Sequence, residues 1–275
     1  MGEKKGGKEV SFLERAAALA RRQVAESREA VPAPELERAC SALPPPPSLR
    51  NALRRPPGEE VRIMAEVKRR SPSRGDIRPA LSVAETVRAY GRGGASAVSV
   101  LTEPHFFGGS LDDLREAAAH CGLPLLRKDF IVHPYQILES RAAGAAAVLL
   151  IVSLLEGKTL SRLMAEASGM GLECLVEVHD EGELERALEA EAEVIGINNR
   201  DLATLAVDKG TVLRLASLVP PSRVLVGESG YRSRGDIVEA GRAGVHAVLV
   251  GEVLSAAEDP EEALRSLRGE GDGLP

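Results

Sequence analysis

The sequence predicts a (β/α)8 barrel that is preceded by an N-terminal helical extension. From Val61 onward, short apolar runs rich in β-branched residues alternate with amphipathic helical runs, a pattern typical of a parallel sheet with helical crossovers. Eight such units follow one another within about 210 residues, which is the size of this barrel. The alternative, an open doubly wound sheet, usually has a glycine-rich loop after its first strand. Here that strand is followed by KRRSPSRGD.

Residues 1–60 form the predicted extension, and residues 61–270 form the predicted catalytic barrel. The stretch SFLERAAALARRQVAE carries apolar residues at helical spacing, which predicts a helix from Ser11 to Ser27. A second short helix follows Pro34, and the stretches LPPPPS and RRPPGEE then interrupt regular structure. Because a single ordered region follows, we interpret this segment as packed on the barrel rather than as a linker.

The barrel elements follow in order along the chain. The predicted strands are residues 61–67, 96–102, 123–129, 146–152, 172–178, 193–198, 223–229 and 246–252. The predicted helices are residues 83–94, 111–122, 134–144, 156–171, 180–191, 209–219, 233–244 and 259–268. Several of them end in a glycine that is typical of a helix C-terminus, namely Gly94, Gly122, Gly144 and Gly244.

Composition narrows the class of protein. The chain has 275 residues, of which 44% are hydrophobic and 28% charged, enough for one large domain or two small ones. Its net charge is -6, so nothing favours nucleic acid or an anionic membrane as a partner. An anionic small substrate remains compatible, because local positive charge can lie within an acidic protein.

The cysteines and the first residues indicate the compartment. Cys40, Cys121 and Cys174 lie far apart and form no CxxC pattern, which predicts a reduced, cytoplasmic protein without disulfides. No histidine has metal-ligand spacing, so we expect no metal. The start MGEKKGGKEV lacks the apolar core of a secretory signal and the Ser or Thr of a myristoylation signal. No apolar run is long enough to cross a bilayer.

The predicted strands end in polar residues, at the end of the barrel where active sites form in this fold. The polar residues at or just beyond the strand ends are Glu66, Lys68, Lys128, Glu177, Asn198, Arg200, Glu228 and Ser229, and the last strand ends near Gly251. Taken singly, each has a structural explanation, such as a solvated lysine, an ion pair or a loop cap. Taken together, they place two lysines, three glutamates and an asparagine on one rim. Burying these groups costs free energy of desolvation, so a functional site is favoured.

Glycines after the last two strands predict a phosphate site. VGESGYRSRGDI and VLVGEVLS follow the strands beside which barrels often bind phosphate. Gly230 and Gly251 would let backbone N–H groups approach an anion, and a short helix starting there would add its dipole. The other explanation is ordinary loop glycine. We predict a phosphorylated small-molecule substrate.

Seven segments in register resemble the indole-3-glycerol phosphate synthase family. They are AEVKRRSPSRGDI, LTEPHFFGGS, LLRKDFIVHPYQI, AVLLIVSLL, LVEVHDEGELERAL, IGINNRDLATLAVD and VGESGYRSRGDI. The resemblance runs from about Ser11 to Arg268. It implies conversion of 1-(2-carboxyphenylamino)-1-deoxyribulose 5-phosphate to indole-3-glycerol phosphate in tryptophan biosynthesis. The steps are ring closure, decarboxylation and dehydration, and no cofactor or metal is expected.

The resemblance also implies catalytic roles. Lys128 would be the acid of ring closure and Glu177 the base of dehydration. Lys68 and Lys128 both remain candidates for the second acid. Glu66 would hold one of these lysines, while Asn198 and Glu228 would orient substrate hydroxyls and ammonium groups.

Binding residues follow from the same resemblance. Ser229, Gly230 and Gly251 would bind the phosphate, although Glu252 stands where some relatives have a small hydroxyl residue. Ser71 and Lys68 would bind the substrate carboxylate. The aryl ring would lie against Phe107, Phe130 and Leu149. Arg200 would be a further binding residue. The resemblance implies a monomer. We expect the extension to cover the barrel mouth, so deleting residues 1–45 should weaken substrate binding.

Two rival functions predict other residues. A phosphoribosylanthranilate isomerase would need a Cys/Asp acid–base pair at the strand ends, whereas the first strand here ends in Glu66-Val67-Lys68. A non-catalytic barrel that only binds a sugar phosphate should lack Lys128, Glu177 or Lys68, and all three are present.

Overall fold

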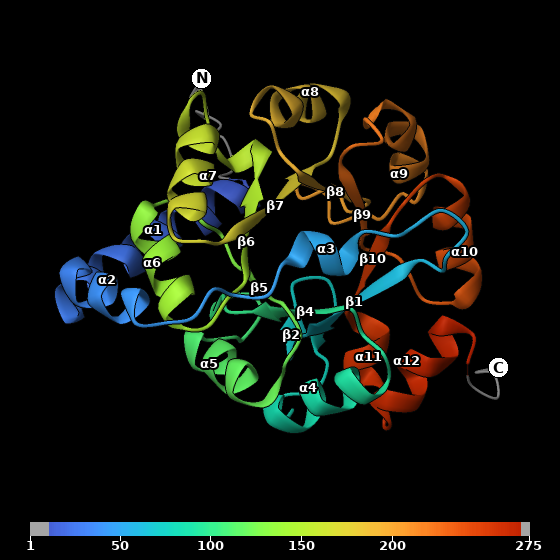
Figure 1. Ribbon diagram of the computed structural model, residues 1–275, viewed down its shortest axis with the longest axis horizontal. Coiled ribbons are helices and arrows are strands. Elements are labelled where there is room, and N and C mark those ends of the chain that lie inside the picture. The colour runs from blue at the N-terminus through green and yellow to red at the C-terminus, as the bar shows by residue number, and fades with distance from the viewer. Residues whose placement is uncertain (1–10, 271–275) are drawn as a thin grey trace, which may run out of the picture.

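The protein is a closed barrel of eight parallel strands with helices around it (Figure 1), which confirms the predicted fold. The computed structural model describes residues 11–270. The predictions made for residues 1–10, including the lack of a secretory signal, lie outside that range. The barrel strands are β1 (Arg62–Val67), β4 (Ala97–Leu101), β5 (Leu125–Lys128), β6 (Ala147–Ile151), β7 (Glu173–Val178), β8 (Val194–Asn198), β9 (Val224–Glu228) and β10 (Ala247–Val250). Each of them overlaps one predicted strand.

The two-residue period of the strands decides which side chains enter the lumen. Leu126, Leu175, Val226 and Leu249 belong to the apolar cluster inside the barrel. The residues two positions further along face the same way and reach the carboxyl-terminal mouth, and they are Lys128, Glu177, Glu228 and Gly251. The alternate residues, such as Val176 and Val248, pack against the surrounding helices. The site is therefore the polar end of an apolar lumen.

The surrounding helices follow the predicted order. They are α4 (Val83–Arg92), α5 (Leu111–His120), α6 (Pro134–Ala142), α7 (Thr159–Gly169), α8 (Glu181–Glu189), α9 (Gly210–Leu215), α10 (Arg234–Arg242) and α12 (Pro260–Arg268). Two short 3-10 helices, η1 (Val152–Leu154) and η2 (Ala216–Leu218), and the short α-helix α11 (Glu252–Ala256) complete them. Gly94, Gly144 and Gly244 have positive φ after their helices, as predicted. Gly122 does not, because α5 ends at His120 and the next residue, Cys121, is already in extended backbone.

The extension contains three helices rather than the two predicted. α1 (Phe12–Ala30) runs three residues past its predicted end, and α2 (Ala33–Ser41) follows. α3 (Leu49–Leu53) was not predicted, since it lies between the two proline-rich stretches. Ser48 caps α3 by accepting a hydrogen bond from the backbone N–H of Asn51 at 3.1 Å. A further difference is the short hairpin β2 (Arg70–Ser71) and β3 (Gly75–Asp76) in the loop after β1.

The extension reaches both ends of the barrel. α3 lies over the centre of the strand ring in Figure 1, and its Leu49 and Leu53 are fully buried among residues at the strand starts. The carboxylate of Glu173 accepts hydrogen bonds from Ser48 Oγ at 2.7 Å and from the N–H of Arg50 at 2.6 Å. At the other end, α1 places Phe12 beside the mouth.

α1 and α2 also pack on the outside of the barrel at α6. The Tyr135 hydroxyl contacts the carbonyl oxygens of Ser27 and Val31 at 3.0 and 2.7 Å. The Arg141 guanidinium donates to the carbonyl oxygens of Leu43 and Pro44. No helix within residues 11–270 is long and apolar enough to cross a membrane.

Candidate active site

A cavity of about 480 Å³ opens at the carboxyl ends of the strands. Every side chain or glycine that the sequence predicted for the site lines it. The catalytic candidates are Glu66, Lys68, Lys128, Glu177, Asn198 and Glu228. The binding candidates are Ser71, Phe107, Phe130, Leu149, Arg200, Ser229, Gly230 and Gly251. The size and the mixture of apolar and polar walls are typical of a small-molecule site.

Lys128 lies at the centre of the polar cluster. Its Nζ is 3.1 Å from Glu177 Oε2 and 3.0 Å from Glu228 Oε2. Burial alone would lower the pKa of Lys128, but the carboxylates of Glu228, Glu177 and Glu66 outweigh it and raise the pKa above the ordinary lysine value. Lys128 is therefore held as an ammonium group that faces the cavity.

The two carboxylates beside Lys128 differ in pKa. Burial opposes ionisation of Glu177, but Lys128 and His179 lower the pKa of Glu177 below its ordinary value. Burial instead raises the pKa of Glu228 to about 7, although Lys128 opposes the shift. Glu228 Oε1 is buried and has no hydrogen-bond partner among the described residues. The pair thus offers one ionised carboxylate and one that titrates near neutrality.

Glu66 and Lys68 form a second ion pair beside the first. Lys68 Nζ lies 2.8 Å from Glu66 Oε1, and Glu66 is almost fully buried. Gly251 leaves the room for this pair, because a Cβ there would lie 2.3 Å from Glu66 Oε1 and 3.0 Å from Lys68 Nζ. Gly251 thus has a packing reason to be glycine besides any contact with phosphate.

Replacing Gly196 of β8 by alanine is expected to lower kcat by about 10- to 100-fold with a smaller effect on KM. A Cβ at this position would lie 2.1 Å from Glu228 Oε1, so the carboxylate must shift from its position beside Lys128. Steady-state kinetics measures the effect. Gly91→Ala in α4 is the matched control, since nothing lies within 4 Å of its added Cβ. Equal kcat in both folded variants would contradict the expectation.

All four phenylalanines of the chain gather at the mouth. The ring centroids of Phe12 and Phe130 are 5.9 Å apart, and those of Phe107 and Phe130 are 6.5 Å apart. With Leu149 they make an apolar wall of the cavity that suits a flat aromatic group. Sequence reasoning did not assign Phe12 to the site, because its position there depends on how α1 docks.

Phe12→Ala is expected to raise KM about tenfold and to change kcat much less. The substitution removes one aromatic wall of the cavity, and a tenfold weaker binding corresponds to about 1.4 kcal/mol, just below the range of about 1.5–3 kcal/mol for fully burying a large apolar side chain. Initial rates over a range of substrate concentrations measure both constants. Val24→Ala is the control, because Val24 is buried on the same helix but does not line the cavity. A raised KM in both variants would mean that docking of α1 matters rather than the Phe12 ring.

The turn after β9, where the sequence predicts a phosphate site, has left-handed backbone at two successive residues. Ser229 and Gly230 have φ values of 63° and 88°, and a Cβ on Gly230 would lie 2.8 Å from Val207, so this turn requires glycine at position 230. Glu252 also lines the cavity. It is paired with Arg74 at 2.9 Å and with Arg232 at 3.1 Å, so its charge is balanced.

The loop after β8 is fixed by its own hydrogen bonds. Asn198 Oδ1 accepts from the N–H of Arg200 at 3.0 Å, and the Arg200 guanidinium donates to the carbonyl oxygen of Leu205 at 2.8 Å. Arg200 therefore lines the cavity while its guanidinium also holds the loop. Among residues 11–270, no three His, Cys, Asp or Glu side chains are grouped so as to hold a metal ion.

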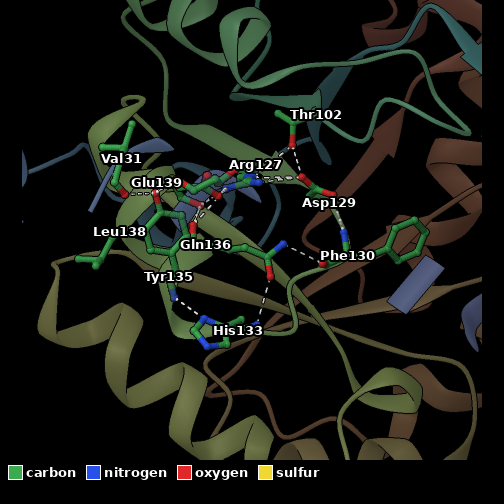
Figure 2. A network of polar contacts seen from close by, with 12 residues as sticks. Val31, Thr102, Arg127, Asp129, Phe130, His133, Tyr135, Gln136, Leu138 and Glu139 are labelled. Atoms are coloured by element: carbon green, nitrogen blue, oxygen red, sulfur yellow. Dashed lines mark hydrogen bonds and ion pairs between the residues drawn. The ribbon is translucent and has the colours of Figure 1, made fainter. Parts of the chain in front are cut away.

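A buried polar network supports β5 from behind the site (Figure 2). Asp129 Oδ2 accepts hydrogen bonds from Thr102 Oγ1 at 2.6 Å and from Arg127 Nη2 at 2.9 Å. Gln136 Nε2 donates to the carbonyl oxygen of Phe130 at 3.0 Å. The network fixes the backbone on both sides of Lys128 and thereby orients the lysine and the Phe130 ring.

Several cavity-lining residues were not predicted from the sequence. They are Phe12, Glu103, Leu202, Leu205, Val207, Lys209 and Arg232, among others. Arg232 was a usable signal, because it ends the stretch GESGYR, whereas Lys209 comes close to Gly230 only in the fold. Both are paired with acids, Lys209 with Asp236 at 2.5 Å and Arg232 with Glu252.

Comparison with solved structures agrees with the fold. The chain is similar to thiamine phosphate pyrophosphorylase from Pyrococcus furiosus, with a TM-score of 0.58 and 18% identity over 81% of this chain and 96% of the other. It is also similar to a mandelate oxidase variant, with a TM-score of 0.59 and 19% identity over 82% of this chain and 79% of the other. At this identity the likeness concerns the barrel alone.

Comparison with protein sequences identifies the family. The family model described as indole-3-glycerol phosphate synthase matches residues 13–267. An indole-3-glycerol phosphate synthase of Nocardioides sp. is 48% identical over 264 residues, which cover 94% of this chain and 99% of the relative. One of Dehalococcoides mccartyi is 50% identical over 213 residues, covering 76% of this chain and 82% of the relative. With the barrel and the polar cluster described above, these matches establish that the chain belongs to the indole-3-glycerol phosphate synthase family.

Proposed function

We propose that Lys128, Glu177 and Lys68 carry the reaction by which this family member makes indole-3-glycerol phosphate. The observation that carries the proposal is the ammonium group of Lys128, held at 3.1 and 3.0 Å from two buried carboxylates at the mouth of the barrel. The substrate is 1-(2-carboxyphenylamino)-1-deoxyribulose 5-phosphate. The reaction releases carbon dioxide and water, so the enzyme is a carboxy-lyase of tryptophan biosynthesis.

Ring closure needs an acid at the ketone oxygen. The aryl carbon that bears the carboxylate attacks the ketone carbon, and Lys128 gives a proton to the oxygen as it becomes a hydroxyl group. Glu177 and Glu228 keep Lys128 protonated before this step. When carbon dioxide then leaves, the electron pair of the broken bond returns to the ring and restores its aromaticity.

Dehydration needs an acid and a base. Lys68 or Lys128 protonates the departing hydroxyl group, and Glu177 accepts the proton of the ring N–H. A proton then moves from the ring CH2 carbon to the nitrogen, which gives the indole with its N–H. The acids donate two protons in the whole reaction and the base accepts one, so one further proton comes from solvent. Glu177 Oε2 lies 3.1 Å from Lys128 Nζ, so the proton taken by Glu177 can be returned directly to Lys128.

Substrate binding uses the remaining walls of the cavity. The phosphate fits at Ser229, Gly230 and Gly251, and the aryl ring fits between Phe107, Phe130 and Leu149. Ser71 and Lys68 bind the substrate carboxylate. Arg200 is a further binding residue. Asn198 and Glu228 orient the substrate hydroxyls, and Glu66 orients Lys68 through their 2.8 Å contact.

The direct experiment is to mix the protein with this substrate and follow indole fluorescence. The chain contains no tryptophan, so an indole signal reports product alone. A rising signal supports the proposal. A folded protein that binds the substrate without any signal would instead be a non-catalytic sugar-phosphate-binding barrel.

We further propose that residues 1–60 act as an extension of a catalytic barrel formed by residues 61–270, and that the protein works as a cytoplasmic monomer. The free thiols of Cys40, Cys121 and Cys174 support a reducing compartment. Light scattering of the purified protein tests the monomer, since a dimer would double the mass.

A further inference from the structure

The second oxygen of Glu177 faces a histidine. Glu177 Oε2 contacts Lys128, and Glu177 Oε1 lies 3.3 Å from His179 Nε2 in an ion-pair contact that lacks hydrogen-bond alignment. The other ring nitrogen of His179, Nδ1, lies 2.9 Å from Glu183 Oε2. The imidazole is thus placed between two carboxylates, one inside the barrel and one on α8.

The local sequence VHDEGE builds this arrangement. Asp180 caps α8 by accepting a hydrogen bond from the backbone N–H of Glu183 at 2.8 Å. The cap turns Glu183 back over the end of β7, where its Oε2 also accepts the backbone N–H of His179 at 2.9 Å. Glu183 therefore holds both the backbone and the ring of His179.

We propose that His179 is a positioning residue for the reaction, and that its protonated ring fixes the orientation and charge of the Glu177 base. The inference rests on the proposed function, in which Glu177 accepts a proton from the substrate. Glu177 is 1% exposed, so a fixed cation is needed to keep it ionised away from water. Lys128 supplies one such cation only while it keeps its proton.

The order of proton transfers gives His179 a distinct task. Once Lys128 has protonated the ketone oxygen, its amine is neutral and no longer offsets the charge of Glu177. A protonated His179 still does so at the opposite oxygen. Glu177 then stays ionised and aimed into the cavity until dehydration, and it becomes a stronger base because one of its two cations has been neutralised.

The charged groups around His179 favour its protonated form. Glu177 lies on β7 and Glu183 on α8, Asp201 follows β8, and Lys128 on β5 lies beyond Glu177. Burial alone would lower the pKa of His179, but the adjacent carboxylates of Glu177 and Glu183 raise the pKa to about 10. The position of His179 between two carboxylates and its raised pKa thus both favour a protonated ring.

The test is His179→Gln, which keeps a nitrogen donor near Glu177 and removes the charge. We expect kcat to fall about 10- to 100-fold with KM within about twofold. Removing a cation raises the pKa of Glu177. When the pH is lowered, Glu177 in this variant therefore becomes protonated at a higher pH than in the wild type. The acidic limb of the pH–kcat profile should accordingly move upward by about one pH unit or more. An unmoved limb would overturn the proposal.

The matched control is His246→Gln, since His246 Nδ1 accepts the N–H of Leu225 at the opposite end of the barrel. The His246→Gln variant should leave the acidic limb of the pH–kcat profile at its wild-type position. Should His179→Gln fail to fold, ¹⁵N NMR of the wild-type imidazoles at pH 8 decides: two protonated nitrogens in His179 support the proposal, and a neutral ring overturns it. A wild type without turnover would defeat the proposed function instead, while the NMR result would still stand by itself.

Discussion

Replacing Lys128 by alanine is expected to lower kcat by at least about 10³-fold, since a general acid contributes about 10²–10⁴-fold and Lys128 also neutralises its neighbours. Without it, Glu177 and Glu228 face each other in a buried site, and mutual repulsion raises the pKa of at least one of them. The variant thus loses the acid and weakens the base. The indole signal of the product, measured in a chain without tryptophan, gives the rate directly.

Lys158→Ala is the control for this experiment, because Lys158 is exposed at the start of α7. It should retain the wild-type rate. A folded Lys128→Ala variant that keeps a tenth of the wild-type kcat would remove Lys128 from the role of acid. Lys68, which lines the same cavity, would then be the candidate for both acid steps.

Glu177→Gln is expected to separate the two halves of the reaction. Glutamine keeps the shape of the side chain and can still contact Lys128, which also retains Glu228 at 3.0 Å. Ring closure and decarboxylation should therefore continue at a reduced rate, while indole formation falls about 10²–10⁴-fold for lack of a base. Release of labelled carbon dioxide from the substrate carboxylate and indole fluorescence, recorded in parallel, measure the two halves.

The comparison of the two signals decides the role of Glu177. If both fall by the same factor, Glu177 acts before decarboxylation, most simply by holding Lys128 protonated. Glu181→Gln is the control, since Glu181 is exposed in the first turn of the neighbouring helix α8. Both signals should be unchanged in that variant.

The sequence allowed the barrel and the polar rim to be predicted for one reason. Strands alternate their side chains, so Leu126 and Lys128, or Leu175 and Glu177, share the lumen face once the strand is recognised. The barrel then brings the strand ends to one rim. This inference needs only local pattern and the closure of the sheet.

The remaining features depend on contacts between distant segments. Phe12 lines the cavity because α1 docks over the mouth, and α3 is helical because Leu49 and Leu53 are buried among residues at the strand starts. Glu252 is balanced by arginines from two other loops. None of these contacts follows from spacing along the chain.

The position of α3 has a consequence for synthesis on the ribosome. The residues around α3 bond to Glu173, Glu193, Ser222 and Gly241, which all lie in the second half of the chain. The segment that emerges early from the ribosome therefore waits for partners that are translated late. Its apolar residues Leu49 and Leu53 lack that cover until then, so we expect chaperones to bind the nascent chain at this segment.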